Sequence, residues 1–487
     1  MKADTVRTRF APSPTGYMHV GNLRTALYAY LVAKARDGKF LLRIEDTDQE
    51  RYVEGAVDII YDTLRETGLL WDEGPDVGGP VGPYIQSERM GMYKEYALLL
   101  VEKGHAYYCF CGKERLERVR EEQKAAGANL SYDGHCLGLS PEEVRAKLGA
   151  GTPYVIRQRM PREGITAFVD EVFGEIRVEN ASLDDQVLLK ADGMPTYNFA
   201  NVVDDHTMGI THVIRGNEYL SSAPKYNLLY KAFGWEVPEY IHCSPVMKNA
   251  TEKLSKRNGD ASYQDLVAKG YLSQAVLNYI ALLGWAPGGE EEIFSLEELV
   301  RVFRVSGISK SPAIFDPLKL NYINAEWIRR MSAEEFHQAA LPWIRKGCAK
   351  AGLDTAFLAG LLHPRCEVLG EIPPQIDFLD ALPEYCVELH RHKKMKTSEE
   401  TALAALREIL PVLRELGDWS AQGIHDALFA LIESKGVKNG VYLWPLRVAL
   451  SGKPVTPGGG TEIAYLLGRE ESLARLETGL RKLEEPA

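Results

Sequence analysis

The sequence is poor in cysteine and has no long apolar segment. Seven cysteines in 487 residues are too few for a disulfide-built secreted scaffold, which favours a reducing compartment. No run reaches the roughly 18 consecutive apolar residues of a membrane span. Residues Met1 to Gly16 also lack the apolar centre of a signal peptide. We therefore expect a cytoplasmic protein with no membrane partner.

Internal repeats and low-complexity tracts are missing as well, so solenoids and wholly disordered chains are excluded. Hydrophobic residues make up 45% and charged residues 26% of the chain, as in ordinary globular proteins. At roughly 150 residues per domain, the length predicts about three domains. The formal net charge of −11 means that any nucleic-acid partner must be met by local basic patches.

The N-terminal segment predicts a strand, a helix and a second strand. Val6 to Phe10 has strand character and leads into a loop rich in proline and glycine. Apolar residues then recur at helical spacing from Leu23 to Leu31, with Gly38 at the expected C-terminal cap, and Lys39 to Glu45 reads as a buried strand. Such a βαβ unit favours a parallel sheet that binds ligands at the carboxyl ends of its strands.

The pattern changes twice further along the chain. Residues 88–191 read as an insertion that contains a charged helical run and β-rich segments. A second α/β stretch follows, with a strand from Thr211 to Arg215 and a helix from Ala223 to Phe233, and we expect it to complete the first sheet. From Ala325 onward nearly every segment has helical periodicity, which predicts an all-α C-terminal part.

The loop between the first strand and its helix, Arg9 to Asn22, is suited to a phosphate. A helix N-terminus offers unpaired N–H groups, Gly16 and Gly21 permit close approach, and His19 adds a donor. By itself, such a segment is usually an ordinary strand-to-helix turn capped by a histidine.

Two further segments carry charge suited to the same ligand. Glu45, Asp46 and Asp48 follow the second strand, where a carboxylate can hold an ammonium group; the alternative is a solvated strand end. The loop from Lys253 to Lys256 brings two mobile cations that could reach one phosphate chain, although such a pattern alone is usually surface.

A fourth segment mixes aromatic, amide and guanidinium groups. Pro195 to His206, together with His212 to Gly216, lies near two predicted strand ends. This mixture suits amino-acid recognition, and the alternative is a tyrosine and an arginine packed at a sheet edge.

Taken together, these segments resemble the bacterial-type glutamyl-tRNA synthetases, which are class I aminoacyl-tRNA synthetases. His19-Val-Gly21-Asn22 is similar to the HIGH signature and Lys253-Leu-Ser-Lys256-Arg257 to the KMSKS signature. The phrases RFAPSPTG, RIEDTD, DEGPDVGG, YNFANVVDDH and HVIRGNEYLSSAP are typical of this family, and the likeness runs from end to end.

The resemblance implies an α/β Rossmann-type catalytic domain with an inserted acceptor-binding domain, followed by an all-α anticodon-binding region. The expected domains are the catalytic domain (1–87 and 192–225), the insertion (88–191), a stem-contact domain with the KMSKS-like loop (226–328) and two helical anticodon-binding domains (329–388 and 389–487).

The resemblance also implies the reaction. Glutamate attacks the α-phosphorus of ATP, and the resulting glutamyl group passes to the terminal adenosine of tRNA(Glu). The attacking carboxylate is already ionised at neutral pH, so positioning and charge neutralisation, with Mg²⁺, carry the catalysis. The implied catalytic residues are His19, Lys253 and Lys256. The implied ATP-binding residues are Ser13, Thr15, His19, Gly21, Asn22, Lys253, Leu254, Ser255, Lys256 and Arg257.

By the same resemblance, the glutamate-binding residues are Arg9, Ala11, Ser13, Glu45, Tyr197, Asn201 and Arg215. Guanidinium groups suit the ligand carboxylate, and Glu45 would meet the α-ammonium group. Glutamine would be rejected because its uncharged amide leaves a buried guanidinium unpaired.

The insertion departs from the family pattern for zinc. Cys109, Cys111 and Cys136 keep the expected spacing, but Gly138 stands where zinc-binding members have histidine. Tyr132 or His135 could supply the fourth ligand, and the alternative is three reduced cysteines without a metal.

The family also implies RNA contacts at Arg157, Arg159 and Arg365, and we expect a monomer. Three alternatives stay open: an enzyme that also charges tRNA(Gln), a transferase acting on a modified tRNA base, and a non-catalytic tRNA-binding paralogue. The transferase group lacks the helical C-terminal half, and the paralogue predicts damaged signatures, whereas here they are intact.

Overall fold

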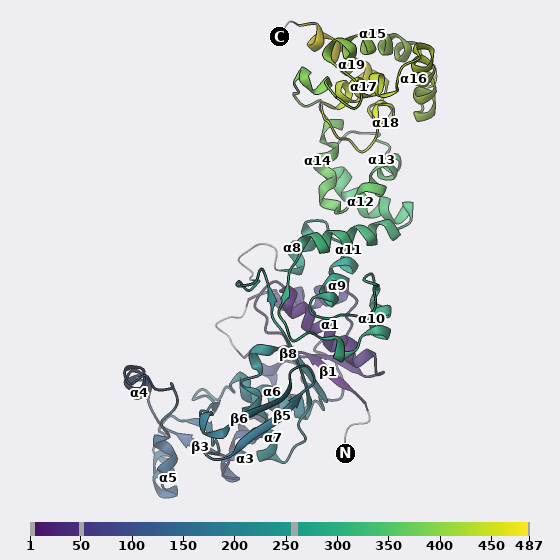
Figure 1. Ribbon diagram of the computed structural model, residues 1–487. Helices are drawn as coiled ribbons and strands as arrows, with labels where there is room; N and C mark the ends of the chain where they lie inside the picture. Colours follow the sequence, from purple (N-terminus) through teal and green to yellow (C-terminus); the bar gives the residue numbers. More distant parts are fainter. Residues whose placement is uncertain (1–4, 48–52, 255–261, 486–487) are drawn as a thin grey trace. The chain divides into compact units, whose positions relative to one another are not determined.

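The computed structural model describes residues 5–47, 53–254 and 262–485. The chain forms two compact units (Figure 1). Unit 1 comprises Met1–Leu266 with Ser273–Pro317, and unit 2 comprises Val267–Leu272 with Leu318–Ala487.

Unit 1 begins with the predicted βαβ order. Strand β1 (Arg7–Phe10) pairs in parallel with β2 (Lys39–Leu42), and α1 (Val20–Lys34) connects them. The helix is buried along most of its length, which agrees with its apolar periodicity. The β2 strand is shorter than expected and ends before Glu45.

The predicted cap at Gly38 is wrong. The helix α1 ends at Lys34, Ala35 is its C-cap, and the left-handed residue after it is Asp37, with φ of 49°. Gly38 has a different reason to be glycine, since a β-carbon there would collide with the carbonyl oxygen of Val6. The close approach of the chain to Val6, rather than helix termination, requires the glycine.

The largest sheet joins strands from distant parts of the sequence. Its order is β6 (Gly174–Glu179), β5 (Ile165–Asp170), β9 (Glu239–Cys243) and β8 (His212–Gly216). Strand β9 runs parallel to both β5 and β8. The amide of Thr211, just before β8, donates to the carbonyl of Arg7 in β1 at 2.9 Å. A strand of the predicted insertion therefore lies directly beside β9.

Two smaller sheets and several helices complete unit 1. One sheet has the order β3 (Ala106–Cys109), β4 (Val155–Gln158) and β7 (Val187–Leu189), and the other pairs β10 (Val246–Met247) with β11 (Ala313–Ile314). The helices from α2 to α10 are α2 (Ala56–Glu66), α3 (Met90–Glu102), α4 (Lys113–Ala125), α5 (Pro141–Gly149), α6 (Tyr197–Thr207), α7 (Ala223–Phe233), α8 (Tyr263–Ala268), α9 (Ser273–Leu282) and α10 (Leu296–Val302).

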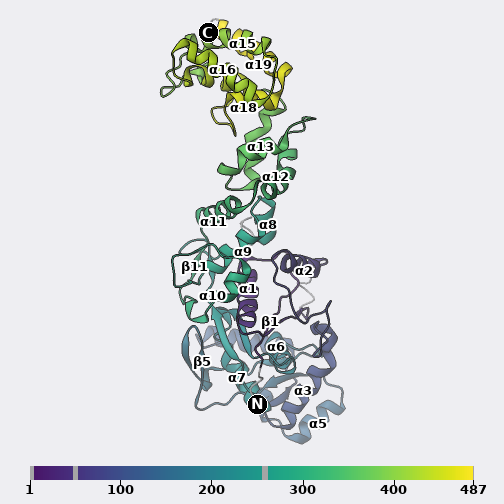
Figure 2. The same cartoon turned by 90° about the vertical axis from the view of Figure 1, so that its right-hand side faces the viewer.

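Unit 2 is helical, as predicted, and within residues 318–485 no strand is present. Its helices are α11 (Pro317–Arg330), α12 (Ala333–Gly347), α13 (Thr355–Leu362), α14 (Ile372–Ile376), α15 (Glu399–Glu415), α16 (Ala421–Lys435), α17 (Gly440–Ser451), α18 (Gly460–Leu467) and α19 (Arg469–Glu484). Helices α15 to α19 gather into one bundle in both views (Figures 1 and 2). A continuous core that includes Phe336, Leu406 and Leu446 fills the unit. No helix in the described part of the chain has both the length and the apolar character needed to cross a membrane.

Candidate active site

A cavity of about 800 Å³ opens at the carboxyl ends of β1, β8 and β9 in unit 1. Phe10, Gly216 and Cys243, the last residues of these strands, all line it. This is where an α/β sheet of parallel strands is expected to bind a ligand.

Most of the residues predicted from the sequence meet in this cavity. Its lining includes Arg9, Ala11, Ser13, Thr15, His19, Gly21, Asn22, Glu45, Tyr197, Arg215, Lys253 and Leu254. Asn201 does not line it; its side chain is buried and donates to the carbonyl of Tyr197 at 2.7 Å. The predicted Ser255, Lys256 and Arg257 lie outside the described residues.

The start of α1 forms one wall of the cavity. His19 is the N-cap residue, and its Nδ1 accepts a hydrogen bond from the Gly21 amide at 3.0 Å. The proton of the neutral ring therefore lies on Nε2, which donates to the carbonyl of Leu254 at 3.2 Å. The first turn of α1 contains no acidic residue. This wall combines a helix N-terminus with the loop that carries Lys253, an arrangement suited to polyphosphate.

A buried network of charges joins the lining residues Arg9 and Glu45 to residues outside the cavity lining. Arg9 and Arg43 both donate to Asp205, at 2.9 and 2.8 Å, and Arg43 also donates to Glu45 at 2.9 Å. Burial alone would raise the pKa of Asp205, but the charges of Arg9 and Arg43 outweigh it and hold that pKa below its usual value. For Glu45, burial prevails over Arg43 and Arg9 and raises the pKa. A cationic group brought beside Glu45 would favour its ionised form.

Arg215 lines the cavity and carries a buried donor without a partner among the described residues. Its Nε donates to Nε2 of His242 at 3.1 Å, and the guanidinium lies 4.7 Å from the ring centre of Tyr226 and 5.2 Å from that of Tyr240. Its Nη2 is buried and has no hydrogen-bond partner among the described residues. Leaving a buried donor unpaired costs about 1–3 kcal/mol. The arrangement therefore calls for an acceptor, such as a carboxylate, from a ligand.

Several groups around the site are not indicated by sequence reasoning. His242 and Asp170 form a buried pair behind Arg215, and Arg24 lines the cavity while donating to the carbonyl of Leu283 at 2.8 Å. Arg43 belongs to the phrase RIEDTD, but the sequence pattern assigns it no role. Arg43 stands inside a predicted buried strand, and a charged residue at such a position is a sequence signal that could have drawn attention to it; no comparable signal marks His242, Asp170 or Arg24.

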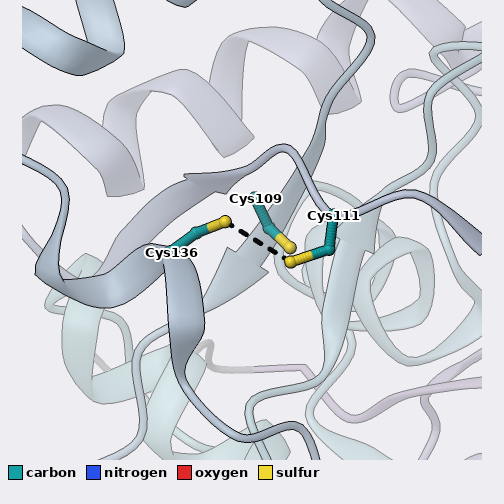
Figure 3. Close-up of side chains that lie close together, drawn as sticks. All are labelled: Cys109, Cys111 and Cys136. Carbon is teal, nitrogen blue, oxygen red and sulfur yellow. Dashed lines mark hydrogen bonds between the residues drawn. The ribbon is translucent and has the colours of Figure 1, made fainter. Parts of the chain in front are cut away.

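A cluster of three thiols lies elsewhere in unit 1. The sulfur atoms of Cys109, Cys111 and Cys136 are all within 4.8 Å of one another and point toward a common centre (Figure 3). The Tyr132 hydroxyl is 3.4 Å from the sulfurs of both Cys109 and Cys111. Burial opposes ionisation of Cys109, but hydrogen bonds from Tyr132, the Cys111 backbone and Arg157 outweigh it and lower the pKa of that thiol. His135 is exposed and does not belong to the cluster.

The predicted RNA-contacting arginines differ in exposure. Arg159 and Arg365 are exposed. Arg157 is only 7% exposed, donates to the carbonyl of Asp185 at 2.9 Å and lies 4.0 Å from the ring centre of Tyr132. The position of Arg157 gives no support to a direct phosphate contact, because the side chain is used inside the insertion.

Comparison with known families defines the class of protein. Residues 5–322 match the catalytic domain of the class I tRNA synthetases of the E and Q group, and residues 335–480 match an anticodon-binding domain. The chain belongs to the class I tRNA synthetases of this group.

Within this class, the individual proteins most similar to the chain in these comparisons include glutamate–tRNA ligases. The chain is 61% identical to the glutamate–tRNA ligase of Clostridium tetani and 59% identical to that of Clostridium acetobutylicum, in each case over at least 99% of both chains. A crystal structure of a glutamate tRNA ligase from Elizabethkingia meningosepticum, in complex with its amino acid, is similar with a TM-score of 0.87 and 36% identity, covering 99% of this chain and 100% of the other. The glutamate–tRNA synthetase of Elizabethkingia anophelis gives a TM-score of 0.88 at 36% identity, covering 98% and 100%.

Proposed function

We propose that the protein is a glutamate–tRNA ligase, which activates L-glutamate with ATP and transfers it to the terminal adenosine of tRNA(Glu). The observation that carries the proposal is the buried, unpaired Nη2 of Arg215, a residue that lines the same cavity as His19 and Lys253. One pocket thus offers a guanidinium to an anionic amino acid and a helix N-terminus with a lysine to a polyphosphate. Full-length similarity to curated ligases supports the same conclusion.

In this proposal the two substrates bind at opposite walls. The side-chain carboxylate of glutamate pairs with Arg215. The α-ammonium group lies beside Glu45, and its positive charge favours the ionised form of this buried carboxylate. Tyr197 and the backbone at Ala11 and Ser13 border the same space. Arg9 helps to balance charge there, although two of its nitrogens already donate to Asp205.

ATP, as its Mg²⁺ complex, occupies the wall formed by the start of α1. Thr15, Gly21 and Asn22 border the nucleotide, while His19 and Lys253 face the phosphates. The α-carboxylate of glutamate attacks the α-phosphorus and pyrophosphate leaves. Because that carboxylate is already ionised, the residues position the reactants and neutralise phosphoryl charge rather than remove a proton. We extend this role to Lys256 and the neighbouring Ser255 and Arg257 as predictions from the signature alone.

The domain division from the sequence is proposed together with the function. The acceptor end of the tRNA would meet the insertion at 88–191, with Arg159 exposed there, and the anticodon would meet the helical residues 329–487. Arg365 is exposed. The pKa of Arg447 is lowered, first by burial and second by the positive charge of Arg365. Two cations therefore lie close together in unit 2. A polyanion would relieve that repulsion. We further propose a monomer located in the cytoplasm.

We also propose that the thiol cluster binds zinc. At a Zn–S distance of about 2.3 Å, tetrahedral sulfurs lie about 3.8 Å apart. The sulfurs of Cys111 and Cys136 are 3.5 Å apart, and the Tyr132 hydroxyl, 3.4 Å from the sulfur of Cys109, offers an oxygen for the fourth position. The metal would hold the segment around Cys136 against β3 as a structural centre.

The decisive test is aminoacylation. The purified chain with ATP, Mg²⁺ and tRNA(Glu) is expected to form glutamyl-tRNA from labelled glutamate and no glutaminyl-tRNA from labelled glutamine, because the amide leaves Arg215 unpaired. A parallel reaction with tRNA(Gln) tests the enzyme that charges both tRNAs. No glutamyl-tRNA in either reaction would favour the non-catalytic paralogue, which no observation on the site supports at present.

A further inference from the structure

We propose that His242 and Asp170 are positioning residues that hold the Arg215 guanidinium in the orientation required by an anionic amino-acid substrate. The proposal rests on the proposed function and deepens it. His242 is the last but one residue of β9, Asp170 is the last residue of β5, and Arg215 is the last but one residue of β8. The three side chains form a buried chain across three neighbouring strands.

The hydrogen bonds set a single arrangement of His242. Asp170 Oδ2 lies 2.6 Å from His242 Nδ1, and a carboxylate accepts, so Nδ1 must carry the proton. Nε2 of the neutral ring is then an acceptor, and the Nε–H of Arg215 donates to it at 3.1 Å. His242 is 0% exposed, so no water competes for either nitrogen. The ring acts as a neutral spacer between a carboxylate and a guanidinium.

Asp170 is itself fixed by backbone donors. Its Oδ1 accepts from the amides of Val172 and Phe173 at 3.0 and 2.8 Å, and its Oδ2 also accepts from the His242 amide at 3.2 Å. The carboxylate is therefore fully occupied by the turn after β5 and by His242. Because Asp170 is fixed, it orients the His242 ring, and the ring in turn orients Arg215. All three side chains are buried, so solvent does not disturb this chain of hydrogen bonds.

Besides His242, three aromatic rings surround the guanidinium of Arg215, which is 5% exposed. The ring centres of Tyr219, Tyr226 and Tyr240 lie 5.4, 4.7 and 5.2 Å from it, but ring contacts are less directional than a hydrogen bond. The bond from Nε to His242 fixes one edge of the plane. The unpaired Nη2 on the guanidinium is then held in place as a donor before a ligand arrives. Such preorganisation lowers the cost of binding a carboxylate.

Amide side chains of different length at residue 242 can show whether His242 positions Arg215 or only fills space in the core. In His242→Gln, the amide oxygen reaches the position of Nε2 and can accept from Arg215; in His242→Asn, the shorter amide reaches only the position of Nδ1. In Asp170→Asn, the amide oxygen is drawn to the backbone donors of Val172 and Phe173, and the NH₂ group then donates to Nδ1. With Nδ1 now accepting, the proton of the His242 ring must lie on Nε2. Nε2 then cannot accept the hydrogen bond from the Nε–H of Arg215.

The measurement is the KM for glutamate and for ATP in charging of tRNA(Glu), together with kcat. We expect the glutamate KM to rise about tenfold or more in His242→Asn and Asp170→Asn, and to stay within roughly threefold of the wild type in His242→Gln. The ATP KM should change less than about twofold in all three variants, because the phosphate wall is untouched. His212→Asn is the matched control, since His212 is a buried histidine of β8 whose side chain is outside the cavity lining.

Some outcomes would overturn the positioning role. An unchanged glutamate KM in His242→Asn, equal losses in His242→Asn and His242→Gln, or a parallel rise in the ATP KM would each do so. Circular dichroism tests whether each variant is folded. If His242→Asn is not folded, the glutamate KM of Asp170→Asn is compared with that of His242→Gln to answer the same question. Failure of the wild type to charge tRNA(Glu) would refute the proposed function instead, so the two failures are distinct.

Discussion

The charged side chains around the cavity are held by buried partners. Arg9 and Arg43 share Asp205, and Arg215 reaches Asp170 through His242. The guanidinium groups of Arg9 and Arg215 are thus oriented before a ligand binds. Removing one member of such a buried pair typically costs about 3–5 kcal/mol, because its partner is left uncompensated.

Another buried side chain, His390 in unit 2, makes stability depend on pH. The ring is 0% exposed, and neither nitrogen has a hydrogen-bond partner among the described residues. Burial lowers the pKa of His390 to about 4, despite the nearby carboxylate of Glu399. An unfolded histidine has a pKa of about 6.5, so below that pH the unfolded chain binds the extra proton. Stability is therefore full above about pH 6.5 and decreases as the pH falls toward 4.

We expect His390→Leu to weaken this pH dependence. Between pH 7 and pH 5, the wild type should lose about 2 kcal/mol more of unfolding free energy than the variant, because the apolar side chain takes up no proton. Urea unfolding at the two pH values, followed by circular dichroism, measures the difference. The control is His425→Gln, which changes an exposed histidine of the same unit. Equal losses in the wild type and His390→Leu would contradict the prediction.

At the scale of elements, the thiol cluster connects two otherwise separate parts of the insertion. Cys109 ends β3, and Cys136 lies in the short 3₁₀ turn η2 (His135–Gly138). The helix α4 between them has no buried residue, so its packing contributes little to holding the segment in place. A metal shared by the two ends would supply that stability.

Removal of one thiol should therefore release the metal. Wild-type protein purified in the presence of zinc is expected to hold about one zinc ion per chain, and Cys136→Ser to hold much less, as measured by elemental analysis after dialysis. Cys386→Ser is the matched control because Cys386 is exposed and lies in unit 2. Tyr132→Phe should retain the ring beside Arg157 but bind zinc more weakly. A wild-type protein without zinc after this treatment would refute the proposal.

At the scale of the whole molecule, the catalytic family match covers unit 1 and extends into unit 2, whereas the anticodon-binding match lies within unit 2. The catalytic match ends at residue 322 and the anticodon-binding match spans residues 335–480. In the proposed arrangement, the orientation of Arg215 depends on Asp170 of β5, a strand from the region predicted to meet the tRNA acceptor end. The binding of tRNA to that region can therefore affect the amino-acid pocket through β5 and β9.

We accordingly predict that ATP–pyrophosphate exchange with glutamate is negligible without tRNA and appears when tRNA(Glu) is added. The expectation follows the family resemblance, and the dependence of Arg215 on the insertion offers a physical reason for it. A tRNA whose terminal adenosine cannot accept glutamate serves as the control, because it binds without being charged. Exchange at full rate with no tRNA would contradict the prediction.

The sequence by itself determined the local structure and the chemical types present at the site. Helical spacing predicted the helix over Leu23 to Leu31 and the helices of unit 2, since periodicity is a local property. Through the family resemblance, the motifs predicted one pocket with Arg9, His19, Glu45, Arg215 and Lys253, and the structure brings these residues to one cavity. Their roles stay predictions until activity is measured.

Only the tertiary structure decided which buried groups pair with one another. Asp170 and His242 are 72 positions apart, and their bond depends on β5 lying beside β9, which no local pattern indicates. The inward position of Arg157 and the true reason for Gly38 arise in the same way from chain segments that meet only after folding. Burial and pairing are sums over contacts distant in sequence, so composition and spacing leave them open.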